Sequence, residues 1–327
     1  GQAELVLEDN RLQTLALSIA THGGGAALPS HVRLIETFEA TGRLDRAVEG
    51  LAPNDELLRR AQDGQGLTRP ELAVLLSTAK LALQDAIEAS SLPDDPSLLD
   101  DLAAAFPPEM RRKWRGAIEN HQLRREILAT KIANRLINRM GVIHPFELAE
   151  EEGASLGDIA AMFVAAERLF DMRALWEAID EAEVSESGRL DLFEFASLAL
   201  RAHVADLLRN SQAGQLPGEL VAQLDPGVSR LESSVDKLLL AEAKSQARTL
   251  SARLARSGVT KRLADRVIRL FELDGAIGLA ALAARKGVEE TLLTRAFTHL
   301  GEALGIDWAQ AAANSMMPSD PWERLLT

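Results

Sequence analysis

The chain has 327 residues, of which 46% are hydrophobic, and this composition indicates a folded globular protein and excludes a disordered one. It has no Cys, so disulfides, zinc-thiolate sites and thiol catalysis are excluded, and no apolar run approaches the ~20 residues that cross a bilayer. The net charge of -13 and the absence of Tyr disfavour nucleic-acid binding. We expect a cytoplasmic protein with no membrane or nucleic-acid partner, and the missing initiator Met suggests a fragment.

Apolar residues recur at the helical period along nearly the whole chain. The spacing i, i+3, i+4, i+7 occurs over residues 12–19 and again over 72–87. No alternating strand with its own turn residues is found, so the sequence predicts an all-α multi-helix bundle with no significant sheet. The expected helices run over residues 3–20, 30–41, 44–62, 69–89, 96–105, 108–140 with a break near 120–121, 145–152, 156–170, 172–183, 189–211, 228–257, 261–273, 276–285, 288–304, 307–315 and 320–327.

Residue pairs at the predicted helix starts support this map. Thr68 and Glu71 have the spacing of a capping box, with Pro70 in the first turn, where proline is tolerated. Ser155 and Asp158 repeat the same spacing at a later helix.

The length of the chain allows either one helical unit or two helical sub-domains. Residues 212–227 are rich in Gly and Pro, which favours a linker. The sequence therefore predicts an N-terminal helical group over 1–211, a linker over 212–227 and a C-terminal helical group over 228–327. The sequence has no repeat of consistent length, which disfavours a solenoid.

Two short patterns resemble parts of a serine hydrolase. Residues 153–157 match Gly-x-Ser-x-Gly, and residues 22–25 read His-Gly-Gly-Gly, a pattern of some oxyanion holes. A nucleophile elbow requires a strand directly before the serine, whereas residues 147–152 are helix-forming. We therefore interpret Ser155 as a helix cap.

No other pattern identifies catalytic, cofactor-binding or metal-binding residues. Residues 64–66 read Gly-Gln-Gly without the third glycine and preceding strand of a dinucleotide site. The six His are scattered, without the i, i+4 spacing of a helical metal site. Acidic pairs fall at linkers and first helical turns, where they favour the helix dipole.

A basic segment stands out in this acidic protein. Between Glu109 and Met140 there are nine Lys or Arg against three Glu. Two interpretations remain open: a solvated helix neutralised by acidic neighbours, or a surface that contacts an acidic partner domain. Asn134 and Asn138 form helices poorly, which suggests specific hydrogen bonds. The candidate contact residues are Arg124, Arg125, Lys131, Asn134, Arg135, Asn138 and Arg139.

Residues 8–18, 64–76 and 123–141 together resemble the C-terminal region of the large bacterial NAD-dependent glutamate dehydrogenases, and residues 320–323 (Asp-Pro-Trp-Glu) resemble a late helix of the same family. The resemblance covers essentially the whole chain and is strongest over 4–180. It implies a parent enzyme that converts L-glutamate, NAD and water to 2-oxoglutarate, ammonia and NADH.

The same resemblance implies that the catalytic and NAD-binding motifs lie upstream of this chain. We therefore expect no catalytic or cofactor residue here and no activity from the chain alone. Residues 1–20 are expected to continue from the dehydrogenase domain, and the rest to pack on that domain, support a homo-oligomer or transmit regulation. The alternative is an independent helical adaptor that binds a protein partner through the basic 111–139 face.

Overall fold

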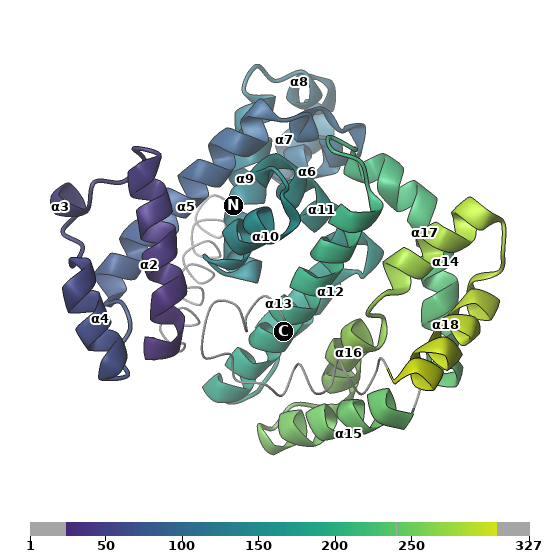
Figure 1. Cartoon of the computed structure of the whole chain (residues 1–327). Coiled ribbons are helices and arrows are strands. Elements are labelled where there is room, and N and C mark those ends of the chain that lie inside the picture. Colours follow the sequence, from purple (N-terminus) through teal and green to yellow (C-terminus); the bar gives the residue numbers. More distant parts are fainter. Residues whose placement is uncertain (1–23, 240, 306–327) are drawn as a thin grey trace. The chain divides into compact units, whose positions relative to one another are not determined.

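The computed structural model describes residues 24–239 and 241–305, and only helices and their connections occur in these ranges (Figure 1). The absence of strands from them confirms the predicted all-α class. Helices expected over 3–20, 307–315 and 320–327 lie outside the described residues. In chain order the helices are α2 (Gly24–Ala40), α3 (Arg46–Glu49), α4 (Asn54–Gln62), α5 (Arg69–Ala89), the 3-10 turns η1 (Leu92–Asp94) and η2 (Pro96–Leu98), α6 (Leu99–Ala103), α7 (Pro108–Lys113), α8 (Arg115–Glu119), α9 (Arg124–Met140), α10 (His144–Glu152), α11 (Leu156–Leu169), α12 (Met172–Asp180), α13 (Glu186–Asn210), α14 (Pro217–Leu238), α15 (Ala241–Arg256), α16 (Lys261–Glu272), α17 (Ala276–Lys286) and α18 (Glu290–Leu304).

The chain divides into two compact units, with the boundary between Gln223 and Leu224, inside α14. Within the described ranges no helix has both the length and the apolar composition needed to span a membrane.

The first unit is built around α11, which contacts α5, α9, α10, α12 and α13. Its residues are apolar or small on nearly every side, and a helix of this kind is buried all round. Ile159 and Phe163 are fully buried. Gly157 allows α11 to approach the end of α5, because a Cβ on this residue would lie 2.8 Å from the Cβ of Ser90. The close fit leaves α11 without a solvent-facing side over most of its length.

The start of α5 is held by a buried carboxylate. Thr68 is the N-cap residue, as predicted, and Glu71 Oε2 accepts hydrogen bonds from the Thr68 backbone N–H and hydroxyl, both at 2.7 Å. Glu71 also accepts from Arg60 of α4 at 2.9 Å and from the backbone N–H of Ala52 at 3.3 Å. Burial alone would raise the pKa of the Glu71 carboxyl, but the bonds from Thr68 and Arg60 hold it below its usual range.

The segment expected to be helical over 108–140, with a break near 120–121, forms three helices. The predicted break near 120–121 is present, because the Asn120 side chain donates to the carbonyl of Gly116 and the His121 Nδ1 accepts from the backbone N–H of Leu123. A second break, at Trp114, separates α7 from α8.

The prediction of one helix over 228–257 is wrong. Residues from Pro217 to Leu238 form α14, and α15 begins at Ala241. The helix therefore includes residues 217–227 of the expected linker. Gly218 and Gly227 serve close packing there instead of turns, because a Cβ on Gly218 would lie 2.9 Å from Asp95 and one on Gly227 would lie 2.9 Å from the Cβ of Ala280.

The second unit contains most of α14 and all of α15 to α18. Within it α15 packs against α16, and α17 packs against α18. Leu231 and Val235 of α14 and Val267 of α16 are buried. Arg230 of α14 donates to both carboxylate oxygens of Glu290 at the start of α18, at 2.9 and 2.6 Å.

Candidate functional site

The predicted contact residues all lie on α9, which packs against α5, α11 and α13 in the first unit. Its apolar stripe is buried, with Leu128, Ile132, Leu136 and Met140 each at most 2% exposed. The helix ends at Gly141, whose φ of 90° favours glycine. The stripe fixes which neighbours the basic side chains of α9 can reach.

The two arginines at the start of α9 bind the end of α5 and η1. Arg124 donates to Asp94 at 3.0 Å, and Arg125 also pairs with Asp94. Arg125 donates further to the carbonyls of Glu88 and Ser90, at 2.6 and 2.7 Å, which satisfies acceptors at the end of α5. The hydrogen bond from Arg125 and the charge of both arginines hold the pKa of the Asp94 carboxyl below its usual range.

Arg135 is part of an ionic group, built on two buried carboxylates, that we name the Asp101 cluster. Its members are Asp101, Arg135, Glu167, Arg168 and Arg173, from α6, α9, α11 and α12. Asp101 lies within 3.1 Å of Arg135, 3.4 Å of Arg168 and 2.8 Å of Arg173. Arg135 Nε also lies 2.7 Å from Glu167. The cluster therefore connects four helices of the first unit.

Burial opposes ionisation of both carboxyl groups of the Asp101 cluster, but their pKa values shift in opposite directions. For Asp101, burial opposes ionisation, but the guanidinium groups of Arg135, Arg173 and Arg168 outweigh it and hold its pKa below the usual range. Burial raises the pKa of the Glu167 carboxyl, which Arg135 offsets in part. The three guanidinium groups make Asp101 the ionised centre of the cluster.

Arg139, at the end of α9, is buried among aromatic rings. Its guanidinium group lies 3.0 Å from Asp180, and its Cζ lies 5.0 Å from the ring centroid of Trp176 and 5.4 Å from that of Phe193. The two rings stack with centroids 5.4 Å apart. This cation–π arrangement joins α9 to α12 and α13.

The remaining predicted residues differ in their burial. Asn138 is 4% exposed, and its Oδ1 has no hydrogen-bond partner among the described residues. Lys131 and Asn134 are half-buried. The structure thus brings the seven residues together on one helix, with Arg124, Arg125, Arg135 and Arg139 contacting other parts of the first unit. Their role as a contact surface stays a prediction.

The serine in the hydrolase-like pattern is a helix cap. Ser155 Oγ accepts from the backbone N–H of Asp158 at 3.1 Å and donates to the Asp158 carboxylate at 2.7 Å, at the start of α11. The preceding element is α10, which ends at Gly153 in the left-handed conformation, so no strand leads to the serine. Residues 22 and 23 of the His-Gly-Gly-Gly pattern lie outside the described residues.

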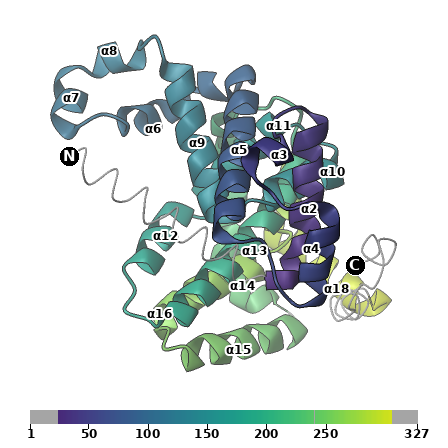
Figure 2. The ribbon, with the colours of Figure 1, turned by 90° about the vertical axis from the view of Figure 1, so that its left-hand side faces the viewer.

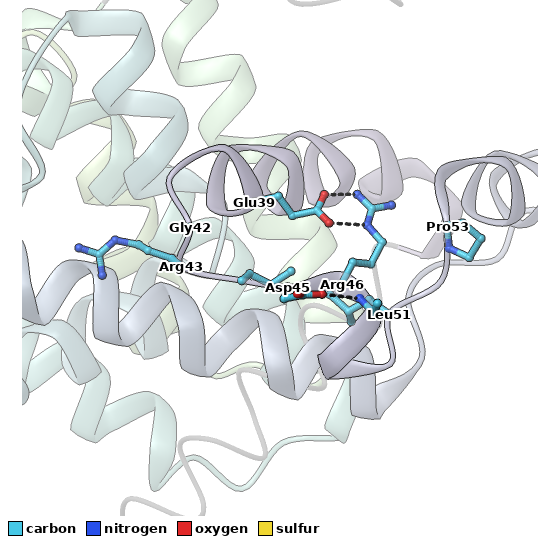
Figure 3. Close-up of a pocket in the computed structure, with 9 residues that line it drawn as sticks. Glu39, Gly42, Arg43, Asp45, Arg46, Leu51 and Pro53 are labelled. Carbon is cyan, nitrogen blue, oxygen red and sulfur yellow. Dashed lines mark hydrogen bonds and ion pairs between the residues drawn. The ribbon is translucent and has the colours of Figure 1, made fainter.

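A surface depression lies between the end of α2 and the loops around α3 (Figure 3). Figure 3 shows the guanidinium group of Arg46 facing the Glu39 carboxylate, with contacts of 3.1 and 2.7 Å. Arg46 donates also to Asn54, and Asp45 accepts from the backbone N–H groups that begin α3. Glu39, Asp45 and Arg46 thus make contacts within the fold, and Arg43, which also lines the depression, donates to Asp85 at 2.7 Å.

Sequence reasoning missed Asp101, Glu167, Arg168 and Arg173. The one available signal was Glu167-Arg168 near the end of the otherwise apolar α11, because a charged pair in a buried helix needs partners. In the described ranges, no group of three or more His, Asp or Glu side chains is placed to hold a metal ion.

A sequence-family model described as "Glutamate dehydrogenase, C-terminal" matches residues 64–327. The chain belongs to the glutamate dehydrogenase C-terminal family. Three similar proteins bear the name "NAD-specific glutamate dehydrogenase". The one from Halomonas elongata is 32% identical over 98% of this chain, that from Pseudomonas aeruginosa 30% over 98%, and that from Mycobacterium tuberculosis 28% over 99%.

Each of these three relatives therefore contains a segment that matches nearly all of this chain. The chain spans only 20% of the length of each of these three relatives. The match agrees with the resemblance found in the sequence motifs over 64–76 and 123–141.

Proposed function

We propose that this chain is the non-catalytic C-terminal region of an NAD-specific glutamate dehydrogenase, with a scaffold, oligomerisation or regulatory role. The parent enzyme oxidises L-glutamate with NAD and water to 2-oxoglutarate, ammonia and NADH. The observation that carries the proposal is that relatives of that name match the chain over 98% or more of its length, yet are about five times longer.

The structural roles of the polar side chains support this proposal. Ser155 caps a helix, Glu71 holds the start of α5, and the Asp101 cluster ties four helices together. These groups stabilise the fold of a helical region. The parent is proposed to be a cytoplasmic homo-oligomer that binds NAD in its upstream dehydrogenase domain.

The test compares the full-length polypeptide with the isolated 327-residue chain in an assay of glutamate-dependent NADH formation. We expect turnover by the full-length polypeptide and none by the isolated chain. Turnover by the isolated chain would overturn the non-catalytic assignment. A gene that encodes no upstream dehydrogenase domain would instead support the independent adaptor.

A further inference from the structure

Helix α7 exposes large apolar side chains and buries none of its own residues. Met110 is 42% exposed and Trp114, which ends the helix, is 53% exposed. A helix of six residues is not stable in water by itself and depends on packing of an apolar face. Met110 and Trp114 nevertheless leave 42% and 53% of their surface exposed in the described part of the chain.

Contacts with neighbouring residues hold α7 and α8 in place. Arg111 Nε donates to the carbonyl of Phe106 at 2.7 Å, and Arg115 pairs with Asp100 of α6 at 2.8 Å. Ile118 of α8 is 3% exposed and anchors the segment. Figure 2 shows α7 and α8 at the outer edge of the first unit, beyond α6. A pre-organised surface loses little conformational entropy on binding.

The chemistry of this segment resembles that of an interface core. Trp, Met and Arg are enriched in protein–protein interfaces, and Trp and Arg often contribute most of the binding energy. Lys113 Nζ lies 5.3 Å from the ring centroid of Trp114. Of the four basic residues in 107–120, Arg112 pairs with Glu109 and Arg115 pairs with Asp100 and Glu119, whereas Arg111 and Lys113 have no carboxylate partner among the described residues. The complementary partner is acidic with an apolar recess for the Trp114 ring.

We propose that Met110, Arg111, Lys113 and Trp114, the α7–α8 surface, dock onto an acidic, partly apolar surface of the upstream part of the same polypeptide. This inference rests on the proposed function. Its occupant follows from charge complementarity and from the length of the relatives, of which this chain spans 20%. The docking surface is thus α7 and α8, whereas the arginines of α9 serve contacts within the first unit.

Hydroxyl-radical footprinting of the full-length polypeptide tests whether the surface is covered. Trp114 should be oxidised several-fold more slowly than its exposure in the described structure implies, close to the rate of Trp176, which is 2% exposed. Oxidation at the rate of a half-exposed tryptophan would overturn the proposal. Measured glutamate turnover by the same sample separates this failure from failure of the proposed function.

A photo-cross-linking amino acid at position 114 of the full-length polypeptide identifies the occupant. We expect a cross-link within one polypeptide to an acidic segment upstream of this chain. A cross-link to a second copy, or to no upstream residue, overturns the proposal. Lys113→Glu should reduce the cross-link several-fold, whereas Val48→Glu, at a 77% exposed site of α3, should leave it unchanged.

Discussion

Replacing Glu71 by Ala removes a buried carboxylate that four donors share. These donors are the backbone N–H and hydroxyl of Thr68, the Arg60 guanidinium and the backbone N–H of Ala52. A hydrogen bond to a charged group contributes roughly 1.5–3 kcal/mol, and breaking a buried ion pair costs about 3–5 kcal/mol. Arg60 keeps Glu56 at 3.1 Å, so its charge is not left unpaired. We expect a loss of about 3 kcal/mol in the free energy of unfolding.

The contribution of Glu71 to stability depends on pH. The folded-state pKa of Glu71 lies below its ordinary value of 4.5, so its contribution to stability is complete above that pH and is lost as the pH falls through the folded pKa. Glu71→Gln, which resembles the protonated acid, should cost about 1–2 kcal/mol at neutral pH. Its difference from the unmodified chain should shrink at pH values below 4.5.

Urea denaturation of the 327-residue chain, followed by circular dichroism, measures these differences. Glu109→Ala is the matched control, because Glu109 is 80% exposed and its pair with Arg112 is worth at most about 1 kcal/mol. If Glu71→Ala costs no more than Glu109→Ala, the reasoning from buried hydrogen bonds is refuted.

Substitutions of Thr68, Arg139 and Gly227 are tested by the same denaturation assay, with Arg139→Lys and Gly116→Ala as comparison variants. Thr68→Ala should cost about 1 kcal/mol through loss of the cap, and an unchanged midpoint would contradict its role at the start of α5. Arg139→Ala should cost about 3 kcal/mol, because it removes the ion pair with Asp180 and the contacts with two aromatic rings. Arg139→Lys should recover only part of this loss. Equal stability of the unmodified chain and both variants would exclude the cation–π arrangement. Gly227→Ala should cost about 1–3 kcal/mol, because the added Cβ would clash with Ala280. Gly116→Ala, where an added Cβ meets nothing within 4 Å, should be neutral or stabilising. A larger loss of stability in Gly116→Ala than in Gly227→Ala would show that Gly227 is not a packing residue.

The start of α5 and the buried stripe of α9 could be predicted because their causes are local. The cap at Thr68 depends on residues three apart, and the stripe on the helical period. The same local signals gave the wrong ends for α14. Gly227 looked like part of a linker, but it is required by close packing against Ala280, which lies far along the chain. A sequence shows that a glycine is present but not whether a turn or a neighbouring helix requires it.

The Asp101 cluster could not be predicted for a related reason. Asp101 and Arg173 are separated by 72 positions, and only the packing of α6 against α9, with α11 and α12 nearby, brings their charges together. The basic segment was visible from composition, but composition does not show that Arg135 and Arg139 turn inward while Lys113 and Trp114 remain exposed.

The central position of α11 also constrains how the first unit is made. Because α11 is buried between α5, which precedes it, and α13, which follows it, it stays partly uncovered until Asn210 has been synthesised. Proteins begin to fold while they leave the ribosome, and uncovered apolar helices promote aggregation. The first unit therefore closes late in its own synthesis, and a polypeptide that stops before α13 would expose its most apolar helix.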